Sequence, residues 1–191
     1  MQWEMRLADA DSAMDELLRM QRIEADSAFS KFISRNYESW VADMSAPGTP
    51  LMSPGVFRSH VFPLLDAGEK VFFVLIDNFR LDQWVAIKPM LAESFTFREE
   101  LYCSILPTAT QYARNAIFSG LMPADIARQF PELWVDEDSE EGKNINESPL
   151  IATQFDRHRR KRRFSYTKIN DSSAGEKLLR ELSNPLCNDL N

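Results

Sequence analysis

Asp77 stands at a position where a carboxylate could do chemistry, directly behind an apolar run. The run, 71–76, reads Val-Phe-Phe-Val-Leu-Ile without interruption. A carboxylate at the carboxyl end of a buried parallel strand lies where open α/β sheets bind their ligands. The same residue could equally cap the helix predicted over 81–88, because aspartate is a favoured N-cap residue.

Thr110 has a comparable place behind a second apolar run, 101–106. Pro107 ends that run because proline cannot donate to a sheet ladder. A hydroxyl in a strand-to-helix turn lies beside free backbone N–H groups and the positive end of a helix dipole. Thr110 could therefore hold an anion such as phosphate. The alternative is that Thr110 is simply the N-cap of the helix predicted over 111–119.

The two apolar runs predict the elements that position these residues. Both are short and rich in β-branched and aromatic residues, which is typical of parallel strands buried on both faces. A helix is predicted after each run, and Gly120 can take the left-handed position that stops the second helix. We therefore predict an α/β fold in which both runs are parallel neighbours in one sheet with flanking helices, and in which Asp77 and Thr110 share an edge.

Two motifs carry a resemblance to a known family. Residues 77–80 read Asp-Asn-Phe-Arg, which resembles the Asp-Gly-Phe-Arg of nucleotide pyrophosphatases and phosphodiesterases in the alkaline phosphatase superfamily. Residues 107–110 read Pro-Thr-Ala-Thr, which resembles their nucleophile segment Pro-Thr-x-Thr, with Gly120 as the helix-ending glycine. Most of the chain is similar to the PglZ domain of PorX-type response regulators, described as bifunctional response regulators and alkaline phosphatases. The expected sheet is then the first part of an alkaline-phosphatase-like sheet.

The resemblance implies roles for particular residues. Asp77 would bind zinc, and Thr110 would be both the nucleophile and a metal ligand. Two Zn²⁺ ions are expected in a complete protein of this kind, and Asn78 and Arg80 are candidate substrate contacts. The later Asp and His metal motifs of the family have no counterpart here, and neither His60 nor His158 belongs to a recognisable ligand motif.

The N-terminal part predicts a helical connector over 1–46, followed by the PglZ-like part over 53–191. From Asp11 or Ser12 onward, apolar and aromatic residues recur at threes and fours, which indicates one long helix or two helices of a small bundle. A segment rich in proline, glycine and serine, 45–54, separates the two parts. In the resembling family such a connector follows a receiver domain, so we expect a chain that begins inside the connector and ends before the next core strand.

Composition limits the remaining classes of function. The chain has 191 residues, a hydrophobic fraction of 44% and a net charge of −7, which argues against a protein that coats nucleic acid. It contains no apolar run near twenty residues and no N-terminal signal pattern, and Cys103 and Cys187 form no disulfide framework, so a cytoplasmic location is expected. The basic run 157–163 is either a solvated helix face or a phosphate-binding rim in which Arg159 and Arg160 contact substrate.

Two classes of function remain open. In the first, the chain is part of a zinc-dependent phosphatase or phosphodiesterase that acts on nucleotide or oligonucleotide phosphoesters, as the output domain of a two-component response regulator. In the second, the same fold is a non-catalytic signalling or protein-interaction module that regulates secretion or transcription. The expected partners are a phosphoester substrate, a receiver domain, a sensor kinase and, as a further candidate, a second copy of the chain, but no membrane.

Overall fold

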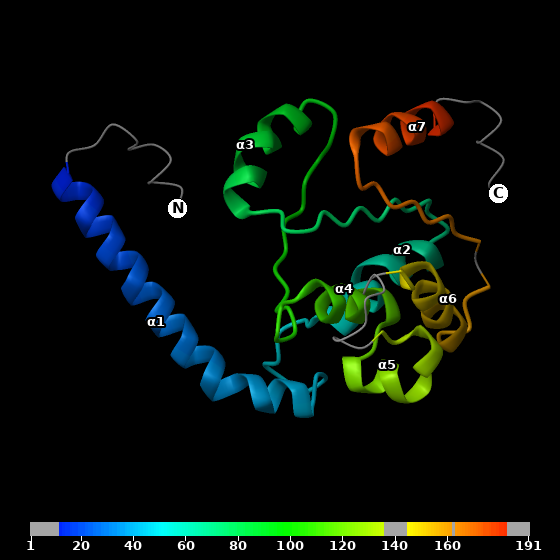
Figure 1. Cartoon of the computed structure of the whole chain (residues 1–191), viewed down its shortest axis with the longest axis horizontal. Helices are drawn as coiled ribbons and strands as arrows, with labels where there is room; N and C mark the ends of the chain where they lie inside the picture. The colour runs from blue at the N-terminus through cyan, green and yellow to red at the C-terminus, as the bar shows by residue number, and fades with distance from the viewer. Residues whose placement is uncertain (1–11, 136–144, 162, 183–191) are drawn as a thin grey trace. The chain divides into compact units, whose positions relative to one another are not determined.

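The computed structural model describes residues 12–135, 145–161 and 163–182, and the chain divides into two compact units, Met1–Thr108 and Ala109–Asn191. The first unit contains α1 (Ser12–Ala42), η2 (Ser53–Gly55), η3 (Phe57–Val61), α2 (Phe62–Asp66) and α3 (Leu81–Leu91). The second contains α4 (Thr110–Ser119), α5 (Pro123–Gln129), η4 (Pro131–Leu133), α6 (Glu147–Arg157) and α7 (Ser172–Leu182), as Figure 1 shows.

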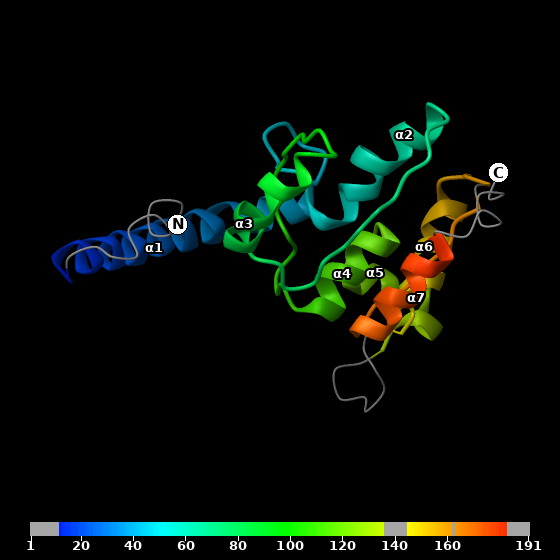
Figure 2. The same cartoon turned by 90° about the horizontal axis from the view of Figure 1, so that it is seen from above.

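The N-terminal helix α1 is one element rather than two. It runs for 31 residues, and Figures 1 and 2 both draw it without a break. Most of its apolar stripe is exposed, including Phe29 and Phe32, whereas Trp40 near its end is buried. The last turns are tied to the rest of the first unit, because the Leu106 backbone N–H donates to the Tyr37 hydroxyl at 2.6 Å. None of the described helices is long and apolar enough to cross a membrane.

The core of the first unit forms around the short helices that follow 45–54. Phe57 packs against Phe62 and Phe73, with ring centroids 6.1 Å and 4.7 Å apart. Ser53 is fully buried, and its hydroxyl accepts a hydrogen bond from the Ile105 backbone N–H at 3.1 Å. The pair Ser53-Pro54 predicts a helix start with Ser53 as the N-cap. A short helix, η2, does start here, but its N-cap is Met52, and the Ser53 side chain instead anchors the chain near residue 105.

The predicted parallel sheet is wrong. Residues 71–76 and 101–106 are extended, but within the described residues they form no ladder with each other. The second run instead makes a single parallel bridge, Met52 to Cys103, in which the Cys103 N–H donates to the Leu51 carbonyl at 2.7 Å. Phe72 is 81% exposed and Leu101 is 95% exposed.

The physical reason for this error lies in what β propensity measures. An apolar, β-branched run fits a pleated surface that is covered by neighbours, and it does not supply those neighbours itself. A ladder also requires a second backbone at hydrogen-bonding distance. In the described part of the chain, helices rather than strands hold the cores of both units. The predicted α/β class is therefore replaced by a mainly helical architecture with extended segments.

The second unit is built on α4 and α6, which lie side by side (Figure 1). The two helices run in parallel. Glu147 at the start of α6 pairs with Arg114 of α4, and Arg157 at the end of α6 donates to the Ser119 carbonyl at the end of α4. Their buried faces supply the core of the unit: Ala116, Ile117, Phe118, Leu150, Ile151 and Phe155.

Two further sequence predictions for the second unit are confirmed. Gly120 has a left-handed backbone with φ of 65° and ends α4, with its N–H donating to the Ala116 carbonyl at 2.9 Å. Leu178, Leu179 and Leu182 share one face of a helix, a pattern that predicts a last helix over 172–182, and α7 spans Ser172–Leu182. Asp171 caps the N-terminus of α7, because its Oδ1 accepts a hydrogen bond from the Ala174 N–H at 2.9 Å.

The sequence of 164–169 predicts an edge strand or a hairpin element. This segment is extended but unpaired as a strand, and its alternate side chains contact the helix pair. Phe164 packs on Phe155 with centroids 5.5 Å apart, and Tyr166 meets Phe118 edge-on at 6.2 Å. Because side chains two positions apart share one face of an extended chain, the contacts of this segment all point the same way.

Candidate functional site

Asp77 lies in a tight turn that ends the extended segment 71–76. Its side chain is exposed, and the next residue, Asn78, has a left-handed backbone with φ of 53°. Among residues with a side chain, asparagine tolerates this conformation best, and glycine tolerates it without cost. Asn78 therefore satisfies the same backbone requirement as the glycine of the motif Asp-Gly-Phe-Arg, and the departure from that motif preserves the turn.

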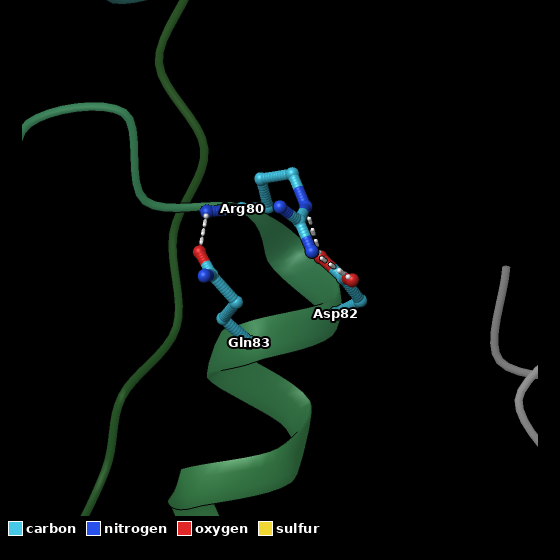
Figure 3. A network of polar contacts seen from close by, with 3 residues as sticks. All are labelled: Arg80, Asp82 and Gln83. Atoms are coloured by element: carbon cyan, nitrogen blue, oxygen red, sulfur yellow. Dashed lines mark hydrogen bonds and ion pairs between the residues drawn. The ribbon is translucent and has the colours of Figure 1, made fainter.

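Arg80 lies just before α3 and binds within its own turn. Its Nε and Nη2 donate to the two carboxylate oxygens of Asp82 at 2.9 Å and 2.8 Å, and its backbone N–H donates to Gln83 Oε1 at 2.9 Å (Figure 3). The hydrogen bond from Arg80 lowers the pKa of Asp82, and the same bond raises the pKa of Arg80. An anion that binds the same Nε and Nη2 donors would have to displace Asp82.

Thr110 is the first residue of α4, and Ala109 is the N-cap. The alternative reading of Thr110 as the N-cap is therefore wrong. The Tyr112 and Ala113 N–H groups both donate to the Ala109 carbonyl at 3.0 Å, so the helix is formed from its first turn. The Thr110 hydroxyl lies at the end of the ten-residue helix where the macrodipole is positive, which favours a nearby anion.

A cluster of four side chains, the Glu147 cluster, joins α4, α6 and the segment after α6. It consists of Glu147, Arg114, Tyr166 and Lys168. Arg114 Nε lies 2.5 Å from Glu147 Oε1, and Lys168 Nζ lies 3.0 Å from Oε2, to which the Tyr166 hydroxyl also donates. Burial, and then the hydrogen bond to Glu147, raise the pKa of Tyr166, so its hydroxyl stays protonated and can donate.

The sequence alone does not indicate this cluster. Glu147 and Arg114 are 33 positions apart, and nothing in the local pattern of either residue indicates a pair. One signal was available: Arg114 stands four positions after Thr110, and residues with that spacing share a helix face. The carboxylate that holds Arg114 could be found only from the structure.

Comparison with known families gives two matches. A model of the BREX system PglZ alkaline phosphatase-like domain matches residues 56–186, and a model of the PorX response regulator linker domain matches residues 1–41. The chain belongs to the PglZ alkaline phosphatase-like family. It therefore combines a phosphatase-superfamily domain with the linker of a response regulator, as the resemblance predicted. A comparison with curated proteins finds no match.

The PglZ match covers both parts of the candidate site, which lie in different compact units. Asp77, Asn78 and Arg80 belong to the first unit, where one turn brings them together, and Thr110 and Arg114 belong to the second. Whether Asp77 and Thr110 act in a common site stays a prediction.

Within the described residues, the basic run of this PglZ chain leaves the helix after Arg157 and does not continue as a helix face. Helix α6 ends at Arg157, and Arg159 has a left-handed backbone with φ of 54°. The N–H groups of Arg159 and Arg160 donate to the Asp156 and Phe155 carbonyls, both at 2.9 Å, so the turn is held to the helix end. Arg162 lies outside the described residues.

The basic run is also remote from Thr110 along α4. Arg157 donates to the carbonyl of Ser119, the last residue of α4, and burial lowers the pKa of Arg157. Since an α-helix rises about 1.5 Å per residue, Ser119 lies about 14 Å along the axis from Thr110. The basic run is therefore better placed to contact a distant part of a substrate than the phosphoryl group beside Thr110.

The family implies metal ions, and the residues of this chain meet only part of that requirement. Asp77 offers an exposed carboxylate, which is a common zinc ligand. His60 lies 3.6 Å from Glu100 Oε2 and is exposed. Within the described ranges, no three His, Cys, Asp or Glu side chains cluster so that they could hold a metal ion. These residues alone do not make a zinc site.

Proposed function

We propose that the chain is part of a phosphoester hydrolase in which Thr110 is the nucleophile and Asp77 is a zinc ligand. The observation that carries this proposal is the place of Thr110, whose hydroxyl stands at the first position of α4 within the PglZ match. The linker match supports a role as the output domain of a regulator that also has a receiver domain and a sensor kinase as partners.

The reaction would proceed in two displacements at phosphorus. The Thr110 oxygen forms a bond to phosphorus and the ester oxygen leaves, after which water hydrolyses the phosphothreonine and restores the hydroxyl. Free threonine is a weak nucleophile at neutral pH, so its proton must be removed. Zinc, when bound, supplies the charge that lowers the pKa of such a hydroxyl. N–H groups at the start of α4 can stabilise the phosphoryl oxygens.

We propose a nucleotide-like phosphoester as the substrate. Asn78 and Arg80 are the proposed contacts in the turn after 71–76, and Arg159 and Arg160 are the proposed contacts in the basic run. Arginine suits this role because its planar fork matches phosphate oxygens. The position of the basic run, at the far end of α4 from Thr110, favours contacts with phosphates beyond the one that is attacked.

The nucleophile is tested by a matched pair of substitutions in the protein with its metal ligands complete. Thr110→Val is expected to abolish release of nitrophenol from a nitrophenyl phosphodiester and to leave the helical circular dichroism signal unchanged, because valine has the shape of threonine. Thr108→Val makes the same change two positions earlier and should retain turnover. Turnover that survives in Thr110→Val and is lost in Thr108→Val would assign the role to Thr108 instead.

A non-catalytic signalling module is a second candidate, and the exposed apolar stripe of α1 favours it. A stripe of this kind is available to a partner helix. If this is the function, Thr110→Val will leave the regulated output of the protein unchanged, while polar substitutions of Phe29 and Phe32 will abolish it.

A further inference from the structure

Ser165 follows a dense group of basic residues, and the proposed hydrolase gives it no role. The sequence from 159 to 165 reads Arg-Arg-Lys-Arg-Arg-Phe-Ser, which places arginines two and three positions before the serine. Of these cations, Arg159, Lys161 and Arg163 are exposed. A partner enzyme with an acidic cleft can recognise such a charge pattern.

The backbone around Ser165 is extended, and it presents the serine hydroxyl to solvent. Phe164 packs on Phe155 and Tyr166 meets Phe118 edge-on, so the residues on either side of Ser165 face the helix pair of α4 and α6. Successive side chains of an extended chain point to opposite sides. Ser165 therefore points away from the helix pair, in agreement with its exposure.

The two aromatic contacts also hold the segment in a shape that a peptide-binding cleft accepts. Many such clefts take their peptides in an extended conformation. A segment that is already extended loses less conformational entropy when it binds. Arg163 lies on the same side as Ser165, about 7 Å along the chain, because side chains two positions apart share a face. The acceptor hydroxyl and one of the recognised cations are therefore presented together.

We propose that Ser165 is a phosphorylation site for a serine kinase that recognises arginine before its acceptor. In the reaction, the Ser165 oxygen forms a bond to the γ-phosphorus of ATP, the bond between that phosphorus and the β–γ bridging oxygen breaks, and ADP leaves. The proton of the hydroxyl passes to a carboxylate of the kinase. The product carries about two negative charges at pH 7 beside the basic run, which opposes the binding of other anions there.

Thr167 is the matched comparison within the same segment. It is exposed and lies on the same side as Ser165, but Phe164 and Ser165 occupy the positions three and two residues before it. Exposure alone predicts that both hydroxyls are modified. Recognition of the arginines predicts that Ser165 is modified and Thr167 is not.

The test incubates the 191-residue chain with ATP, Mg²⁺ and a serine kinase that selects arginine two and three positions before its acceptor, and follows the mass of the intact chain. Phosphate is expected at Ser165, located by fragmentation of the chain. Ser165→Ala should abolish its incorporation, and Thr167→Ala should leave it unchanged. An unaltered chain that takes up no phosphate would overturn the proposal, as would incorporation at the same level in Ser165→Ala.

A second pair of variants tests whether the kinase reads the arginines. Arg163→Gln removes one charge-assisted hydrogen bond to the kinase and should lower the rate of phosphorylation about tenfold. The control Arg128→Gln removes an exposed arginine that pairs with Asp125 in the same unit, and it should leave the rate unchanged. Equal rates in these two variants would show that the basic residues are not recognised.

A synthetic peptide of residues 159–170 separates the contribution of the sequence from that of the fold. Both the peptide and the folded chain should be phosphorylated. If only the peptide is modified, the contacts of Phe164 and Tyr166 keep the segment out of the kinase cleft, and the proposal is wrong for the folded chain. These measurements require neither Thr110 nor zinc, so a failure here leaves the proposed hydrolase untouched, and a failure of the hydrolase leaves this site untouched.

Discussion

At the scale of single residues, two left-handed positions show how side chains and backbone constrain each other. Asn78 keeps the turn after 71–76 although the resembling motif has glycine there. At Gly120, by contrast, a residue with a side chain does not fit, because the fully buried Gln154 lies against the glycine. A methyl group at Gly120 would lie 3.0 Å from Gln154 Cδ and nearer still to Nε2. Backbone conformation and packing therefore both require glycine at this position.

Gly120→Ala is expected to destabilise the second unit. The left-handed backbone alone costs about 1 to 2 kcal/mol for a residue with a Cβ, and displacement of Gln154 adds to that cost. The matched control is Gly175→Ala in α7, where the nearest atom to the new methyl, Ile169 Cγ2, lies 3.8 Å away. The free energy of unfolding of that variant should rise by about 0.5 to 1 kcal/mol, because alanine has a higher helix propensity than glycine. Urea denaturation measures the free energy of unfolding of both variants, and an equal change in the two would contradict the packing argument.

At the scale of elements, local signals in the sequence predicted helices well and the sheet badly. The stop at Gly120 and the helix over 172–182 depend on nearby residues, and both are confirmed. The runs 71–76 and 101–106 carry the composition of strands, but a strand exists only through a partner elsewhere in the chain. For the same reason Thr110 could be singled out from its turn, whereas the pair Arg114 and Glu147 could not.

The basic run is expected to bind single-stranded oligonucleotides. Arg159, Lys161 and Arg163 are exposed and make no ion pair within the described ranges. Changing all three to glutamine should weaken binding and reduce the salt slope by about 2, given about 0.7 for each phosphate contact. Fluorescence anisotropy with oligothymidylate at several salt concentrations measures this.

The matched control for the basic run removes the same charge elsewhere. Arg22, Lys31 and Arg35 on α1 are also exposed, and changing them to glutamine alters the net charge equally. Equal losses in the two triple variants would mean that only total charge matters. An unchanged salt slope in the variant of the basic run would leave that run as a solvated turn.

At the scale of the whole molecule, the 191-residue chain should not be an effective zinc hydrolase. Asp77 and Thr110 supply two oxygen donors, whereas zinc in proteins takes about four ligands. Zinc should therefore bind weakly, and the Thr110 hydroxyl should stay protonated. Nitrophenol release and bound zinc are measured together after dialysis against zinc. Robust zinc-dependent turnover by this chain would show that its metal ligands lie elsewhere than we infer.

The exposed extended segment 71–76 has a consequence for solubility. Short apolar runs of high β propensity associate into cross-β aggregates unless charged gatekeeper residues flank them. Phe72 and Val74 are 81% and 76% exposed, and the flanking charges are Glu69 and Lys70 before the run and Asp77 after it. Asp77 is therefore a gatekeeper as well as a candidate zinc ligand.

Asp77→Ala should shorten the lag before thioflavin T fluorescence rises, with a chelator present throughout. Asp82→Ala removes an equal charge five positions further along, inside α3, and should leave the lag unchanged. Equal lags would remove the gatekeeper role. If the lags differ as expected, a low zinc content in Asp77→Ala can reflect self-association as well as a lost ligand, and zinc has to be measured on the monomeric fraction.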